Sequence, residues 1–194
     1  MQIACIGSRE IPPESANACR EMGMGLVRAG YTVVTGATPG TPGRDDWANW
    51  ADAAFAAGAY YLNPTRLIVC LPWQHFPHGS GSPPPEISVG YVEEHLEWAE
   101  AARRYWEAER AAYVGPWAAI HRATSLRYVR NAGIILQSRL VLAWPHGEAN
   151  GTRFAMGFAE WRGVPVIDLE IAPWREALAA LVAQPHLIGD SNRC

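Results

Sequence analysis

The chain has 194 residues, which is enough for one domain with a buried core. Hydrophobic residues make up 49% of it and charged residues 18%, a composition that excludes a disordered chain. A net charge of −3 and a pI of about 6.1 argue against a general electrostatic attraction to nucleic acid or to a membrane surface.

Strand-like and helix-like segments alternate in the first part of the chain. Short apolar runs predict three β-strands, at residues 2–6, 31–35 and 67–71. Between them, residues 12–29 predict a helix that begins at a proline pair, and residues 45–57 predict an Ala-rich helix that Gly58 ends. A β-α-β-α-β order is typical of a parallel sheet covered by helices.

A proline-rich and helical insert follows, at about 72–116. Residues 72–90 hold five prolines and several glycines and serines, and they predict a long loop. Loops of this length are either functional lids or tolerated surface insertions, and the sequence leaves both interpretations open. Residues 92–113 predict a helix with mixed Glu and Arg, which is most simply a solvated face.

The remainder of the chain returns to the alternating pattern. It predicts helices at 117–135, 151–162 and 173–182, and strands at 139–144 and 165–169. We therefore expect an α/β fold: a single Rossmann-like three-layer domain over residues 1–194, with a central parallel sheet of about five strands and the insert attached to it.

Glycine-containing turns follow three of the predicted strands. Ligands of open parallel sheets bind at the carboxyl ends of the strands, where glycine lets a phosphate approach backbone amides and a helix N-terminus favours negative charge. A tryptophan at the end of the third strand, Trp73, is well placed to stack on a base. These turns predict a phosphate-binding loop and a nucleotide-type ligand, with site residues Gly7, Ser8, Arg9, Thr35, Gly36, Ala37, Gly151 and Thr152.

Three further polar residues are candidates for the same site. Asp45 either caps the following helix or binds a ribose hydroxyl. Arg130 and Asn131 lie in an otherwise apolar helix, where an unpaired charge is costly. Arg130 therefore either pairs with an acidic residue, such as Asp45, or reaches the bound anion.

Several familiar chemistries have no signature in the sequence. The histidines are not at metal-ligand spacing, so we expect no metal, and neither the GxxxxGK[ST] nor the GxGxxG motif is present, so we expect no dinucleotide cofactor. Glu86 would serve as a general acid or base only if the insert folds over the site. The cysteines match no zinc pattern and no apolar run reaches membrane-spanning length, which favours a cytoplasmic protein without a membrane partner.

Taken in order, these motifs resemble the SLOG superfamily. That group includes the Rossmann-like domain of DNA-processing protein A (DprA/Smf), the YspA-like proteins and the LOG-type nucleotide phosphoribohydrolases, and the chain looks closest to small DprA-like proteins of phages and bacteria. The resemblance spans nearly the whole chain. It rests on the order of Gly7-Ser8-Arg9, Thr35-Gly36-Ala37 with Asp45, Arg130-Asn131, and Gly151-Thr152. It implies a nucleotide-derived ligand held at the strand ends by these same residues.

Departures from the family pattern leave the activity open. LOG enzymes carry a catalytic Glu three residues after their Gly-Thr pair, and Ala155 stands there in this chain, so that mechanism is not expected. The first hypothesis is a protein that senses or sequesters a nucleotide-derived ligand. The alternatives are an enzyme acting on a nucleotide N-glycosidic bond and a DprA-like binder of single-stranded DNA. The resemblance and the tryptophan-rich surface also imply a homo-oligomer.

Overall fold

The structure, a computed structural model, describes residues 1–37, 50–74, 85–148 and 150–183. Its centre is a six-stranded, all-parallel sheet in the order β4-β3-β2-β1-β5-β6. The strands are β1 (Gln2–Gly7), β2 (Thr32–Thr35), β3 (Leu67–Leu71), β4 (Ser88–Tyr91), β5 (Val141–Trp144) and β6 (Val166–Asp168). The longer helices are α1 (Pro13–Arg28), α2 (Ala51–Leu62), α3 (Leu96–Glu109), α5 (Arg122–Leu136), α6 (Asn150–Trp161) and α7 (Trp174–Ala183), with the short α4 (Ala111–Val114) after α3.

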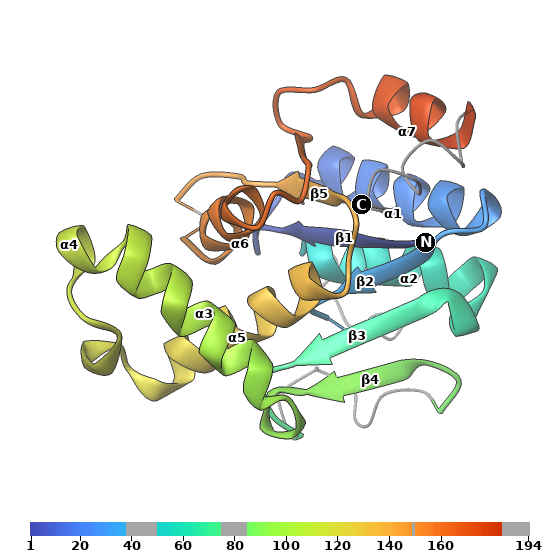
Figure 1. Cartoon of the computed structure of the whole chain (residues 1–194). Coiled ribbons are helices and arrows are strands. Elements are labelled where there is room, and N and C mark those ends of the chain that lie inside the picture. Colours follow the sequence, from blue (N-terminus) through green and yellow to red (C-terminus); the bar gives the residue numbers. More distant parts are fainter. Residues whose placement is uncertain (38–49, 75–84, 149, 184–194) are drawn as a thin grey trace, which may run out of the picture.

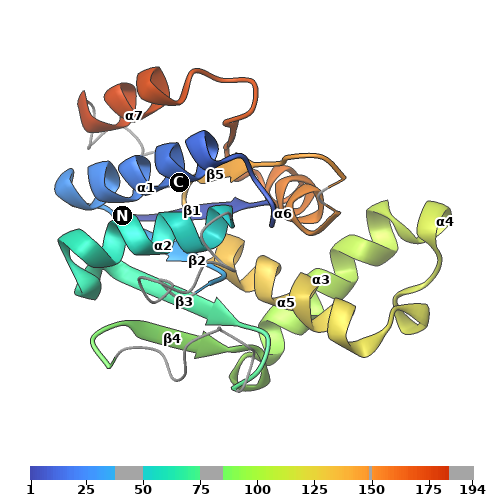
Figure 2. The same cartoon turned by 180° about the vertical axis from the view of Figure 1, so that it is seen from behind.

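Helices cover the sheet on both faces, giving three layers. Helices α1 and α2 lie on one face with α7 outside α1, and α3, α5 and α6 lie on the other (Figures 1 and 2). Alternate residues of one strand enter opposite cores: Ile3 and Cys5 face the α1/α2 side, whereas Ala4 and Ile6 face the α5/α6 side. This period of two is what a strand buried on both faces requires, and it confirms the α/β, Rossmann-like prediction.

The sheet has one strand more than the five that we expected, because β4 lies inside the predicted insert. Its four residues, Ser88–Tyr91, pair in parallel with β3 at the edge of the sheet. The segment is short, follows a proline run and is only partly buried, so its sequence lacks the apolar run that marks the central strands.

Gly58 does not end the second helix as predicted, since α2 continues to Leu62. A Cβ at Gly58 would lie 2.1 Å from the carbonyl oxygen of Arg20, and one at Gly23 would lie 2.3 Å from that of Phe55. Both glycines therefore allow α1 and α2 to cross in close contact. The absence of a side chain at Gly58 serves the packing of the two helices and does not end α2. The start predicted for this helix, residue 45, lies outside the described residues.

Among the described helices, none combines the length and the apolar character that crossing a membrane would need.

Candidate functional site

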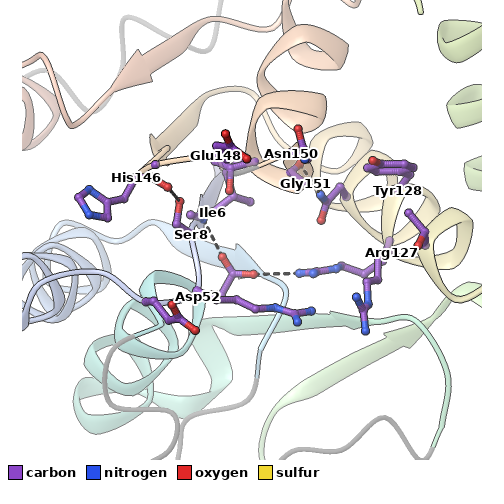
Figure 3. A pocket seen from close by; sticks show the side chains of 17 residues that line it. Ile6, Ser8, Asp52, Arg127, Tyr128, His146, Glu148, Asn150 and Gly151 are labelled. Atoms are coloured by element: carbon purple, nitrogen blue, oxygen red, sulfur yellow. Dashed lines mark hydrogen bonds and ion pairs between the residues drawn. The ribbon is translucent and has the colours of Figure 1, made fainter. Parts of the chain in front are cut away.

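A pocket opens at the carboxyl ends of β1 and β5. Strands β2, β3 and β4 lie on one side of β1, and β5 and β6 lie on the other. The direction in which the chain adds strands therefore reverses between β1 and β5. Such a switch point is where open α/β sheets bind their ligands. The pocket has a volume of about 710 Å³, and its walls come from the β1 end, α5, and the segment from β5 into α6 (Figure 3).

Ser8 joins the end of β1 to the end of β5 by hydrogen bonds. Its backbone amide donates to the carbonyl of Trp144 at 2.9 Å, and its hydroxyl lies 3.2 Å from the same carbonyl and 2.9 Å from that of His146. The hydroxyl hydrogen is thus used within the protein, which leaves the Ser8 oxygen as an acceptor toward the pocket.

Asp52, at the start of α2, is the central group on the β1 side of the pocket. Its Oδ1 accepts the amide hydrogen of Gly7 at 2.7 Å, and its Oδ2 forms an ion pair with Nη1 of Arg130 at 2.9 Å. Both side chains are buried, with 12% and 10% of their surface exposed. The acidic partner of Arg130 among the described residues is therefore Asp52, whereas Asp45 lies outside them.

Gly36 makes room for this ion pair. A Cβ on Gly36 would lie 1.2 Å from Nη1 of Arg130 and 2.6 Å from Oδ2 of Asp52. The guanidinium of Arg130 thus occupies the space beside the glycine turn after β2. The amide of Gly7, in the turn after β1, is already bonded to the Asp52 carboxylate. We call the group formed by Gly7, Gly36, Asp52 and Arg130 the β1 corner.

The opposite end of the pocket is built by α5 and the N-terminus of α6. Thr124, Arg127, Tyr128 and Asn131 line the pocket and recur at the three- and four-residue spacing of one helix face. Nδ2 of Asn131 donates to the carbonyl of Gly151 at 2.8 Å and so joins the two helices.

At the start of α6, three residues line the pocket: Asn150, Gly151 and Thr152. The first amides of a helix have no partner inside the helix, and its dipole is positive at this end. We call the group formed by Arg127, Asn131, Gly151 and Thr152 the α6 corner.

Three guanidinium groups converge on the pocket, those of Arg9, Arg127 and Arg130. Burial and the charges of Arg127 and Arg130 lower the pKa of Arg9, although Asp52 opposes the shift. The Arg9 guanidinium also lies 4.7 Å from the ring centre of Trp50.

Two of these arginines have donors that the protein leaves unused. The Nε atoms of Arg127 and Arg130 are buried and have no hydrogen-bond partner among the described residues. Repelling cations with unsatisfied donors are costly, and an anion in the pocket would relieve both costs.

Acidic groups offset part of this charge. Glu10 and Glu148 line the pocket from exposed positions, and Asp52 is the third carboxylate. At the mouth, the His146 ring is 3.0 Å from the Glu170 carboxylate. The described residues contain no group of three or more His, Cys, Asp or Glu suited to a metal ion.

The structure brings most of the sequence-predicted residues to this pocket. Trp73 and the turn residues Thr35 and Ala37 are not among the lining residues; the Thr35 hydroxyl lies 3.4 Å from the backbone carbonyl of Asp52, and Ala37 is buried. Gly36 lines a small adjoining cleft of about 30 Å³. Those that line the main pocket are Gly7, Ser8, Arg9, Arg130, Asn131, Gly151 and Thr152.

Sequence reasoning missed Asp52 and the polar face of α5. Asp52 lies in an Ala-rich helix, where a single acidic residue carries no motif. The α5 face had a detectable signal, because Thr124, Arg127, Tyr128 and Asn131 recur at helical spacing in a segment that was interpreted as apolar.

In comparisons with known proteins, no protein-family model, no curated protein and no solved structure matches the chain.

Proposed function

We propose that the protein binds a nucleotide or nucleotide-derived ligand in the pocket between β1 and β5, and that it senses or sequesters this ligand. The observation that carries the proposal is the convergence of three arginines, two of which have buried donors without a partner among the described residues, and a helix N-terminus on one pocket of about 710 Å³ at the switch point of the sheet. That volume lies within the range typical of small-molecule sites.

The α6 corner is the proposed position of the phosphate. Gly151 and Thr152 offer first-turn amides, Thr152 adds a hydroxyl, and Arg127 supplies a charged donor from the facing helix. Hydrogen bonds between ionised partners are about twice as strong as neutral ones, so the phosphate would hold most of the affinity. Tyr128 and Thr124 then line the space left for the nucleoside.

A panel of nucleotides tests the proposal by saturation-transfer NMR. Nucleoside mono-, di- and triphosphates, NAD, ADP-ribose and cyclic nucleotides are each mixed with the protein. We expect saturable transfer to at least one of them, with the ligand unchanged after hours. Failure of every member to bind at low salt contradicts the proposal.

An enzyme that acts on an N-glycosidic bond is the second candidate. Such a reaction needs a carboxylate near the ribose, where positive charge develops. Glu10 and Glu148 line the pocket, whereas Glu86 does not. Growth of free-base or free-sugar signals in the same panel, lost on Glu148→Gln or Glu10→Gln, would favour this candidate over a binding protein.

A further inference from the structure

The carboxylate of Asp52 stands where the glycine turn after β1 offers its donors to an anion. It lines both the main pocket and the small cleft beside it. Its partners are a backbone amide, that of Gly7, and a guanidinium, that of Arg130. Amides of glycine turns and arginine forks are the donors that proteins present to phosphate groups.

We propose that Asp52 is a built-in anion that fills the phosphate position of the β1 corner, and that it thereby confines an external anionic group to the α6 corner. The second half rests on the proposed function. We therefore expect a ligand that places one phosphate-type group in the pocket, at the α6 corner. The other anion position, at the β1 corner, is already filled by Asp52.

The backbone holds the carboxylate in this place. The amide of Ala51 donates to the carbonyl of Ser8 at 3.1 Å, which fixes the first turn of α2 against the end of β1. A Cβ on Gly7 would lie 2.4 Å from Cβ of Ala51, so only glycine allows this approach. Asp52 therefore projects from the first turn of a helix that is hydrogen-bonded to the end of β1.

The electrostatic consequence differs between the two corners. At the β1 corner the carboxylate compensates Arg130 at 2.9 Å, whereas no ion pair of the described residues includes Arg127 or Arg9. An arriving phosphate therefore meets a neutralised Arg130 at the β1 corner and, at the α6 corner, Arg127, which forms no ion pair among the described residues. Repulsion between the phosphate and Asp52 strengthens this preference.

Removing the carboxylate should create an anion site where Asp52 stood. We expect Asp52→Ala to gain saturable stabilisation by sodium formate, with a rise in melting temperature at least five times that of the wild type at equal concentration. Formate carries the two lost oxygens to the Gly7 amide and the Arg130 guanidinium. An equal response of variant and wild type overturns the proposal.

A matched control separates this effect from general salt stabilisation. Glu100 pairs with Arg104 on the exposed surface of α3, so Glu100→Ala also removes the carboxylate of an arginine pair. Because solvent already screens that arginine, we expect Glu100→Ala to respond to formate as the wild type does.

A second variant keeps the test decisive if Asp52→Ala does not fold. In Asp52→Asn the amide oxygen still accepts from Gly7, while the amide nitrogen no longer compensates Arg130. We expect calorimetry to show at least tenfold tighter binding of inorganic phosphate than in the wild type. Unchanged affinity in Asp52→Asn contradicts the built-in anion.

Nucleotides separate this inference from the proposed function. In the wild type we expect a nucleoside diphosphate to bind no more than about threefold tighter than its monophosphate, and in Asp52→Ala, where the position is vacant, we expect that preference to rise at least tenfold. A wild type that binds neither nucleotide overturns the proposed function, while the formate and phosphate results still decide the role of Asp52.

Discussion

Arginine side chains stand at both ends of the pocket, but among the described residues only Arg130, at the β1 corner, forms an ion pair with a carboxylate. At the β1 corner, Arg130 is paired with Asp52, and the Gly7 amide is bonded to the same group. At the α6 corner, Arg127 has a buried Nε without a partner among the described residues, and the first turn of α6 faces the pocket. Convergence of arginines alone therefore does not distinguish the two ends of the pocket, whereas their pairing does.

Glycines that follow a strand can thus have two different roles, which the sequence alone does not distinguish. Gly36 and Gly151 both follow a strand, yet a Cβ on Gly36 would overlap Arg130, whereas one on Gly151 would meet only Nδ2 of Asn131 at 3.6 Å. The first glycine makes space for a protein side chain, whereas the second lines the pocket without such an overlap.

The largest effect is expected from Asp52→Ala, which breaks the β1 corner. The variant leaves Arg130 buried without its counter-charge and the Gly7 amide without an acceptor. Breaking a buried pair in this way costs about 3–5 kcal/mol of the free energy of unfolding. Denaturant unfolding measures it, and a loss below about 1 kcal/mol would show that the pair contributes little to the fold.

Arg127→Ala breaks the α6 corner and should act on binding instead. Its removal relieves repulsion with Arg9 and deletes an unsatisfied Nε, so the free energy of unfolding should stay within about 0.5 kcal/mol of the wild type. A charge-assisted hydrogen bond to phosphate is worth about 1.5–3 kcal/mol, so nucleotide affinity should fall at least tenfold. Calorimetry that finds equal affinities would remove Arg127 from the site.

Gly36→Ala and Gly151→Ala sharpen the contrast with one methyl group at each corner. The Cβ at position 36 forces Arg130 to move and should cost about 1–3 kcal/mol of stability, as overpacking does. At position 151 the same change adds a better helix former whose Cβ makes only an ordinary contact with Asn131, and we expect a gain of up to about 1 kcal/mol. Thermal unfolding of the two variants side by side checks the prediction, and equal losses would contradict it.

Asn131→Ala should give the smallest effect. It removes the hydrogen bond from Nδ2 to the Gly151 carbonyl, one neutral bond worth about 1 kcal/mol. Because that bond joins α5 to the start of α6, we expect amide hydrogen exchange to accelerate in the first turn of α6. Exchange that changes only elsewhere would show that Asn131 does not position this helix end.

Much of the fold follows from the sequence because the central strands are buried on both faces. The run at β3 is apolar throughout and that at β1 is apolar from Ile3 to Ile6, and both were predicted to within a residue. β4 was missed because Ser88–Tyr91 lies at the edge of the sheet, where pairing needs no apolar run. Gly58 misled the prediction because a helix crossing and a helix end both favour glycine.

The pocket could be located from the sequence, but its internal pairing could not. The turns at Gly7 and Gly151 follow strands that topology brings together, so their meeting was predictable. Which carboxylate compensates Arg130 depends on the way α2 docks on the end of β1, and the two partners, Asp52 and Arg130, are 78 residues apart in the chain. No local pattern encodes that distance.

Amide chemical shifts during an anion titration show which of the two corners takes the anion. Inorganic phosphate and then the tightest nucleotide of the panel are added to ¹⁵N-labelled protein. We expect saturable shifts for the Gly151 and Thr152 amides, while the Gly7 amide stays bonded to Asp52 and does not shift. Shifts centred on Gly7, or no shift at either corner at low salt, would contradict it.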